Sequence, residues 1–146
     1  MPKHSATIQI NASTDKVWEL VSNGSRLSDW LSPVRGVDTV EPDGPLAPGS
    51  KLEATLGNVG GAKINIKKAE RGRLLHWSAG PFLAHMMRMP MFVDLELEPR
   101  GDSTQATITF RTNPMMAPIM KMMTGLYFSE EAPSTVQKLK QAVESS

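Results

Sequence analysis

Two side chains in apolar surroundings are the candidates for acid–base chemistry in this sequence. His85 begins the stretch HMMRMPMFVDLELE, and Tyr127, the only tyrosine, follows a methionine-rich run. A histidine there could act as a general base or orient a carbonyl group, and the tyrosine hydroxyl could donate a hydrogen bond to one. The ordinary alternatives are a half-exposed histidine at the end of a strand and a core aromatic whose hydroxyl reaches water or backbone. His85 and Tyr127 are therefore the candidate catalytic residues, and both alternatives stay open.

The other reactive side chains do not combine into a known type of reaction centre. Ser78 and Ser129 lack histidine and acid partners in the sequence, so nucleophilic hydrolysis has no support. His4, His76 and His85 show no metal-ligand spacing and no carboxylate pair beside them, and the chain has no cysteine. We therefore expect no metal and no cofactor.

Charged side chains within the strand-like segments are expected to face solvent. They alternate with apolar residues, which places them on the opposite face of each strand. The residues in question are Arg88, Asp94, Glu96, Glu98 and Arg111. His76 alternates with Trp77 and is expected to face outward in the same way. Neither arginine is expected in a pocket, and the three carboxylates are expected to form an ordinary solvated face.

The charge balance argues against a nucleic-acid partner. The chain has 16 basic and 15 acidic residues, a formal net charge of +1, and no basic run longer than two. A nucleic-acid surface needs a one-sided basic stripe. The start MPKHSATIQI lacks the long apolar segment of a signal peptide, and no window approaches the length that spans a bilayer. We expect a cytoplasmic protein without stable membrane insertion, as a monomer or weak homodimer.

Nine of the ten methionines fall in two short segments, residues 85–98 and residues 114–123. Methionine is unbranched and polarizable, so it can repack around different shapes. The methionines either fill gaps in an ordinary core or line a cavity for an apolar ligand. The small number of aromatic residues favours the cavity, because a flexible wall is a poor choice where tight packing is the aim.

The first part of the chain predicts a strand followed by two short helices. Residues 4–11 alternate between apolar and polar side chains, as in a half-buried strand. Ser13 or Thr14 can cap a following helix, and Gly24 is the candidate for its left-handed stop. The segment SRLSDWL then predicts a second short helix, which Pro33 closes.

From residue 36 to residue 113 the hydrophobic period is two. Apolar residues alternate in KLEATLG, AKINIKK, LLHWSAG and QATITFRT, and turn sequences such as ERGR and PRGDS separate them. In the stretch 85–98 the inward positions include His85, Met87, Met89 and Met91. Alternation over consecutive hairpins predicts an antiparallel sheet with one apolar face.

After Pro114 the period becomes helical. An apolar stripe runs from Met116 to Tyr127, and a similar stripe continues to Val143. We expect one long C-terminal helix with a kink or break near residues 129–134, because Pro133 removes a hydrogen bond and clashes with the preceding turn. This helix can cover the apolar face of the sheet, so the whole chain, residues 1–146, is predicted to be a single α+β domain.

Three sequence motifs occur in a suggestive order: ATIQINASTDKVWELVSN near the start, PGSKLEATL at 48–56 and LLHWS at 74–78. With Trp30 and the C-terminal helix, they resemble the START/birch-pollen-allergen superfamily (SRPBCC), in its polyketide cyclase/dehydrase branch. The resemblance implies a helix-grip fold, in which a curved seven-stranded antiparallel sheet surrounds the long C-terminal helix. It also implies two short helices after the first strand, a deep apolar cavity, and a lid formed by the loop GNVGG at 57–61.

The superfamily contains lipid carriers, cyclases, receptors and co-chaperones, so the resemblance leaves several functions open. The first hypothesis is binding or transport of a lipid-, polyketide- or sterol-like molecule, without catalysis, in a methionine-rich cavity between the sheet and the helix. The alternative is a metal-free polyketide cyclase/dehydratase, in which His85 or Tyr127 moves protons for aldol closure and loss of water. The third is a protein-interaction module similar to the co-chaperone branch.

The residues expected to bind the ligand lie on the inward positions of strands and on the helical stripe. They are Trp30, Leu56, Ile64, Trp77, Met87, Met89, Met91, Ile108, Met116, Met120, Met123 and Tyr127. For Trp30 and Trp77, packing in the core is an equal explanation. Trp18 is expected to be structural and to hold the first helix to the sheet.

Overall fold

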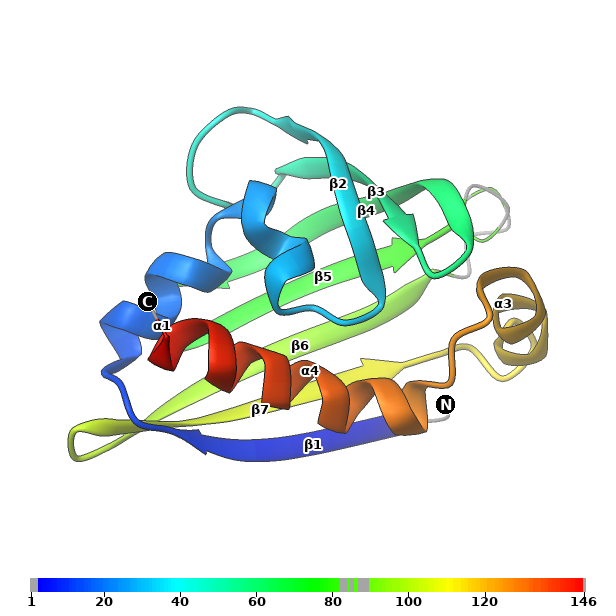
Figure 1. The fold of residues 1–146 in the computed structure, drawn as a ribbon. Helices are drawn as coiled ribbons and strands as arrows, with labels where there is room; N and C mark the ends of the chain where they lie inside the picture. Colours follow the sequence, from blue (N-terminus) through cyan, green and yellow to red (C-terminus); the bar gives the residue numbers. More distant parts are fainter. Residues whose placement is uncertain (1–2, 82–83, 85, 87–89, 146) are drawn as a thin grey trace.

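Seven antiparallel strands form one curved sheet in the computed structural model, which describes residues 3–81, 84, 86 and 90–145, with residues 120 and 123 described by their backbone alone (Figure 1). The strands are β1 (Lys3–Ile10), β2 (Val34–Glu41), β3 (Lys51–Leu56), β4 (Val59–Glu70), β5 (Leu74–Gly80), β6 (Met91–Arg100) and β7 (Ser103–Arg111). Their order across the sheet is β1-β7-β6-β5-β4-β3-β2, and every neighbouring pair is antiparallel. The predicted seven-stranded antiparallel sheet is confirmed.

The helical segments of the described residues are the α-helix α1 (Thr14–Val21), the short 3-10 helix η1 (Gly24–Asp29), and the α-helices α3 (Ala117–Thr124) and α4 (Phe128–Glu144). Two short helices follow the first strand, as predicted. Figure 1 shows α4 lying across the sheet, and it packs against β1 and β7. None of the helices within these ranges is long and apolar enough to cross a membrane.

The capping residue of α1 determines where the helix begins, as predicted, but Gly24 does not determine where it ends. Ser13 Oγ accepts a hydrogen bond from the backbone N–H of Lys16 (3.2 Å), as an N-cap should. The helix ends at Val21, and Ser22 Oγ donates back to the carbonyl of Trp18 (2.7 Å). Gly24, the expected left-handed stop, instead begins η1, where a Cβ would lie 3.0 Å from the side chain of Leu46. Gly24 is therefore closely packed against side chains and does not form a left-handed turn.

The C-terminal helical region is two helices where one was expected. The interruption lies at residues 125–127, and α4 is continuous across residues 129–134, so the chain has no break where one was predicted. Gly125 adopts a left-handed conformation (φ 71°) that ends α3, as glycine commonly does at a helix end. Pro133 lies inside α4, in its second turn, without ending the helix.

The stretch 85–98 is a strand only from Met91 onward. Ala84 and Met86 are helical, and β6 begins after Pro90. A proline has no N–H to donate, so it does not fit where β6 is paired on both sides; Pro90 directly precedes that part, and Pro99 lies beyond it, paired with β7 alone. The predicted strand start at residue 85 is therefore wrong. His85, Met87, Arg88 and Met89 lie outside the described residues.

The inward positions of the strands form the core together with α4. The alternation predicted for β3, β4, β5 and β7 is confirmed, because each inward apolar residue is at most 2% exposed. These residues are Leu52, Ala54, Leu56, Ala62, Ile64, Ile66, Leu75, Trp77, Ala106, Ile108 and Phe110. From α4, Ala132, Val136, Leu139 and Val143 are buried in the same cluster. The apolar face of the sheet is thus covered by the C-terminal helix, as its sequence pattern requires.

Candidate ligand-binding site

The segments that carry the methionines leave the sheet at one end. β6 begins at Met91 and β7 ends at Arg111, and the strand register pairs Phe92 with Arg111. The start of β6 and the end of β7 are therefore close to each other. Figure 1 shows α3 just beyond this end of the sheet. We call the region formed by the start of β6, the end of β7 and α3 the methionine end.

Helix α3 is fastened to the β3–β4 turn, several strands away from β7. The backbone N–H of Asn58 donates a hydrogen bond to the carbonyl of Thr124 (2.9 Å). Gly57 lies so close that a Cβ on it would overlap the same carbonyl oxygen, and its φ of 58° also favours glycine. Because α3 is connected to β7 at its start and contacts this turn at its end, it spans the methionine end. The loop 57–61, expected as a lid, is a tight turn at 57–58 followed by β4.

The described methionines divide into buried and strongly exposed ones. Met91 and Met116 are each 1% exposed and belong to the core. Met86, Met115 and Met122 are 63%, 72% and 81% exposed. Flexible apolar side chains therefore lie at the methionine end from the interior to the surface. Met87 and Met89 lie outside the described residues, and the side chains of Met120 and Met123 are not described.

Seven of the predicted ligand-binding residues are brought together in the interior. Each is at most 2% exposed and belongs to one core cluster. They are Trp30, Leu56, Ile64, Trp77, Met91, Ile108 and Met116. Their assignment to a ligand stays a prediction, since the same burial also describes a packed core.

Tyr127 does not join this interior group. It is 52% exposed and occupies the N-cap position of α4. Lys121 Nζ lies 4.4 Å from the centre of its ring, a cation–π contact at the surface. The expectation that Tyr127 lies on a buried helical stripe is therefore wrong. The reason is the interruption at residues 125–127, which ends α3 before the stripe would reach this position.

Two buried indole N–H groups in the interior have no hydrogen-bond partner among the described residues. They belong to Trp30 and Trp77, whose side chains are 0% and 1% exposed. Their rings are in edge-to-face contact, with centroids 6.3 Å apart and an interplanar angle of 89°. Most buried indole N–H groups find an acceptor, so two N–H groups without one, on rings that touch each other, are unusual.

Two residues after Trp30 in the chain, Ser32 belongs to a polar cluster whose members form hydrogen bonds with one another. Ser32 Oγ and Thr135 Oγ1 lie 3.0 Å apart, and the backbone N–H of Ser32 donates to Thr135 Oγ1 (3.3 Å). Ser32 Oγ also contacts the carbonyl oxygen (3.2 Å) and the carboxylate of Glu131. These bonds fasten the segment before β2 to α4. They leave the indole of Trp30 without an acceptor from this cluster.

Sequence reasoning missed a charged cluster on the outer face of the sheet. Asp94 on β6 accepts from both His76 Nδ1 on β5 and Arg111 on β7, and its side chain is only 16% exposed. Phe92 stacks on the imidazole, with centroids 5.9 Å apart. His76 thus does have a carboxylate partner, and Asp94 is not an ordinary solvated residue. The strand register, which pairs His76 directly with Asp94, would have predicted this contact.

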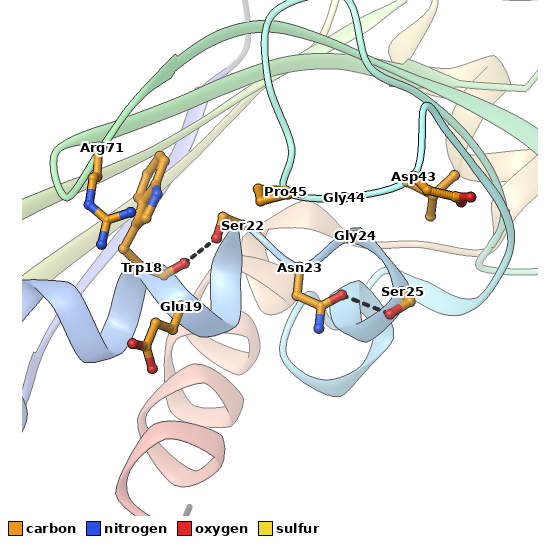
Figure 2. Close-up of a pocket in the computed structure, with 11 residues that line it drawn as sticks. Trp18, Glu19, Ser22, Asn23, Gly24, Ser25, Asp43, Gly44, Pro45 and Arg71 are labelled. Atoms are coloured by element: carbon orange, nitrogen blue, oxygen red, sulfur yellow. Dashed lines mark hydrogen bonds between the residues drawn. The ribbon is translucent and has the colours of Figure 1, made fainter.

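A surface depression of about 600 Å³ is formed by residues of α1, η1, the β2–β3 connection and the β4–β5 turn (Figure 2). Figure 1 shows α1 at the opposite end of the sheet from α3. It is lined by Trp18, Glu19, Ser22, Asn23, Gly24, Ser25, Val40, Asp43, Gly44, Pro45 and Arg71. Figure 2 shows the guanidinium of Arg71 beside the Trp18 ring, with Asp43 on the far side of the depression. Ser25 Oγ donates to Asn23 Oδ1 (2.7 Å), so these polar groups bond locally. The lining contains none of the predicted ligand-binding residues and no methionine.

The sequence matches the family described as polyketide cyclase / dehydrase and lipid transport over residues 1–144. Its fold is similar to that of protein MLL2253 from Mesorhizobium loti (TM-score 0.74, 16% identity, 99% of this chain and 98% of that chain). It is also similar to the Aha1 dimer from Colwellia psychrerythraea (TM-score 0.68, 18% identity, 99% and 97%). DynU16, from the dynemicin biosynthetic locus, has a TM-score of 0.68 at 14% identity, and the similarity covers 97% of this chain but 47% of DynU16. A search of curated proteins found no match.

These structural similarities at identities of 14–18% show a shared fold and not a shared function. The family match, in contrast, covers almost the full sequence. The helix-grip fold and the SRPBCC superfamily that the sequence motifs suggested are confirmed. The chain belongs to the polyketide cyclase/dehydrase and lipid transport family.

Proposed function

We propose that this protein binds an apolar small molecule between the concave face of the sheet and α4, and that the molecule enters at the methionine end. The observation that carries the proposal is the distribution of methionines there. Met91 and Met116 lie in the core, while Met115 and Met122 on the same side reach solvent. A ligand moving inward would therefore meet flexible, polarizable side chains along its whole path, and such side chains can repack around it.

The interior suits a ligand that is mostly hydrocarbon. Its walls are aliphatic and aromatic side chains from the strands and α4, in one continuous cluster. The family description, which includes both cyclase/dehydrase and lipid transport, supports a ligand of this class. The described side chains are closely buried, so binding requires displacement of some of them. Methionine tolerates such displacement better than a β-branched or aromatic residue.

Binding without chemistry is favoured over a cyclase reaction. Aldol closure needs at least two acid–base groups pointing at the substrate. In the described part of the chain, the buried polar side chains are serines and threonines, and several of these are already bonded. Thr104 Oγ1, for example, donates to the carbonyl of Ala12 (2.8 Å), and Thr135 is bonded to Ser32. Tyr127 is at the surface, so the cyclase hypothesis rests on His85, which lies outside the described residues.

The neighbours Met115 and Met116 provide a matched test. Met116 is 1% exposed and Met115 is 72% exposed, so Met116→Asp places a charge in the apolar interior and Met115→Asp places it in water. We expect saturable, blue-shifted Nile red emission with the wild-type protein. Met116→Asp should weaken the affinity about tenfold or more, and Met115→Asp should leave it nearly unchanged.

The wild-type titration decides whether the proposal stands, independently of how well the variants fold. Native mass spectrometry of the same samples should show one Nile red bound per chain. If the wild-type protein binds neither Nile red nor any co-purified apolar molecule, the proposal is overturned. Equal affinity of a folded Met116→Asp variant would place the ligand elsewhere on the molecule.

A further inference from the structure

We propose that the bound molecule carries a neutral carbonyl oxygen, and that the indole N–H groups of Trp30 and Trp77 donate hydrogen bonds to it. This inference rests on the proposed function, because it names a chemical group of the same ligand. The class is an apolar ketone, ester or lactone. Neither a plain hydrocarbon nor a free fatty acid would fit equally well.

The first argument is the state of the two donors. Both N–H groups are buried and without an acceptor among the described residues. A buried donor without an acceptor costs free energy, and folded proteins seldom leave one. Here two such donors belong to rings in direct contact, so they lie in the same small region of the core. One acceptor placed there by a ligand would give these donors a hydrogen bond that the described residues do not provide.

The second argument is that the polar groups adjacent to each tryptophan in the chain or in the sheet bond to one another. Trp77 lies in the middle of β5, between β4 and β6, and the neighbouring backbone groups bond along the two ladders. Ser32, two residues after Trp30, is bonded to Thr135 and Glu131. None of these groups accepts from an indole N–H, which leaves a bound molecule as the acceptor that we assign.

The third argument is the position of the indoles relative to the methionine end. On the concave face of β5 and β6, Ala79 pairs with Met91, and the next inward pair is Trp77 with Val93. Trp30 lies shortly before Pro33, whose carbonyl accepts from the N–H of Gly57 in the turn that holds α3. Both indoles therefore lie just inside the methionine end, where an entering ligand would reach them after Met91.

The charge of the surroundings favours a neutral acceptor. Among the residues described as buried, the polar ones are serines and threonines, with no lysine, arginine or histidine to balance a carboxylate. The carboxylate of Glu131 contacts Ser32, close to Trp30 in the chain. A fatty-acid carboxylate would lose its hydration and gain no cation, which is costly in an apolar interior. A ketone or ester carbonyl accepts hydrogen bonds without that penalty.

Proton–nitrogen correlation spectra of the indole N–H groups test this directly on the wild-type protein. The three tryptophans should give three indole signals. We would titrate with methyl nonyl ketone, with undecane and with undecanoate. The ketone should shift the Trp30 and Trp77 proton signals downfield, as a new hydrogen bond does, while the Trp18 signal stays in place. Undecane should bind without these downfield shifts, and undecanoate should bind more weakly than the ketone.

The outcomes separate failure of the inference from failure of the proposed function. If neither Nile red nor any of the three probes binds, the proposed function fails. If Nile red binds but none of the three probes does, the carbonyl assignment is overturned. If ketone and undecane bind alike and leave both indole signals unshifted, binding stands but the carbonyl assignment is overturned. The assignment also fails if both indole signals are downfield and protected before any ligand is added, because a buried water would then be the acceptor. Tighter binding of undecanoate would overturn the neutral class.

Tryptophan-to-phenylalanine variants give a second readout. Trp30→Phe and Trp77→Phe keep an aromatic ring and remove the N–H group. Each should lower the ratio of ketone affinity to undecane affinity about 2–10-fold, the range expected for one hydrogen bond. The ratio cancels the loss of packing that the smaller ring causes for both probes. Trp18→Phe, at the depression on the opposite end, should leave the ratio unchanged.

Discussion

Asp94 receives hydrogen bonds from a histidine and an arginine that stand on the two strands beside it. Its side chain is largely buried under these partners, whereas Glu96, two residues further along β6, is exposed. The same alternation that places both carboxylates on the outer face therefore gives them different surroundings. A carboxylate that accepts two charge-assisted hydrogen bonds contributes more than one that faces water.

Asp94→Asn should accordingly lower the free energy of unfolding by about 1–3 kcal/mol, because His76 and Arg111 lose their common charged acceptor. Glu96→Gln is the matched control, and we expect a change within about 0.5 kcal/mol, as for most surface substitutions. Urea unfolding of both variants measures the difference. If Asp94→Asn is as stable as Glu96→Gln, the cluster contributes nothing to the fold. Nile red binding should be unaffected by either change, since both residues lie on the face away from α4.

At the scale of single elements, the sequence was sufficient wherever one periodicity or one capping residue decides the structure. The alternation in β3, β4, β5 and β7 predicted the buried residues of those strands, and Ser13 predicted the start of α1. Pro90 excludes a strand that begins at residue 85 only once the start of β6 is known to pair on both sides. Local sequence patterns do not determine strand register or the close contacts between segments that are distant in the sequence. For this reason the partners of Asp94 and the exposure of Tyr127 could not be predicted.

The turn that holds α3 shows how strongly one distant contact can constrain an element. Gly57→Ala would drive a Cβ into the carbonyl oxygen of Thr124, at a backbone conformation that already disfavours alanine. We expect a loss of roughly 1–3 kcal/mol in the free energy of unfolding. Gly60→Ala is the control, because a Cβ there meets nothing within 4 Å. Thermal unfolding compares the two variants.

The same pair of variants tests whether α3 covers the ligand's path. If α3 separates from the β3–β4 turn in Gly57→Ala, the amide of Asn58 loses its acceptor on Thr124 and should exchange with solvent faster. Nile red should then associate faster with Gly57→Ala than with Gly60→Ala. Equal association rates, with the faster exchange observed, would mean that α3 does not limit access.

At the scale of the whole molecule, the two ends of the sheet are closed by different means. At the methionine end, α3 contacts the β3–β4 turn and the apolar core. At the other end, α4 forms hydrogen bonds to the segment that joins β1 to α1. Lys140 Nζ donates to the carbonyl of Gln9 (2.9 Å), and Glu144 accepts from the backbone N–H of Asn11 (3.0 Å) and from Lys140 Nζ (2.5 Å). An apolar end that can open and a polar end that stays fixed would let α4 remain in place while a ligand enters.

At the polar end, Glu144 makes the stability of the fold depend on pH. The hydrogen bond from Lys140, followed by that from the Asn11 N–H, holds the pKa of Glu144 below its ordinary value in the folded state. Because the folded pKa is the lower one, the stabilisation is complete above the unfolded pKa and is lost as pH falls through the folded pKa. Glu144→Gln should therefore be less stable than wild type at neutral pH, and the difference in urea midpoint should shrink as the pH falls below the ordinary range of glutamate. Glu19→Gln, an exposed change on α1, should show no such convergence. If the difference in urea midpoint between Glu144→Gln and wild type stays constant down to acid pH, the ionised carboxylate does not stabilise this end of the sheet. The Lys140–Gln9 hydrogen bond alone would then hold α4 to β1.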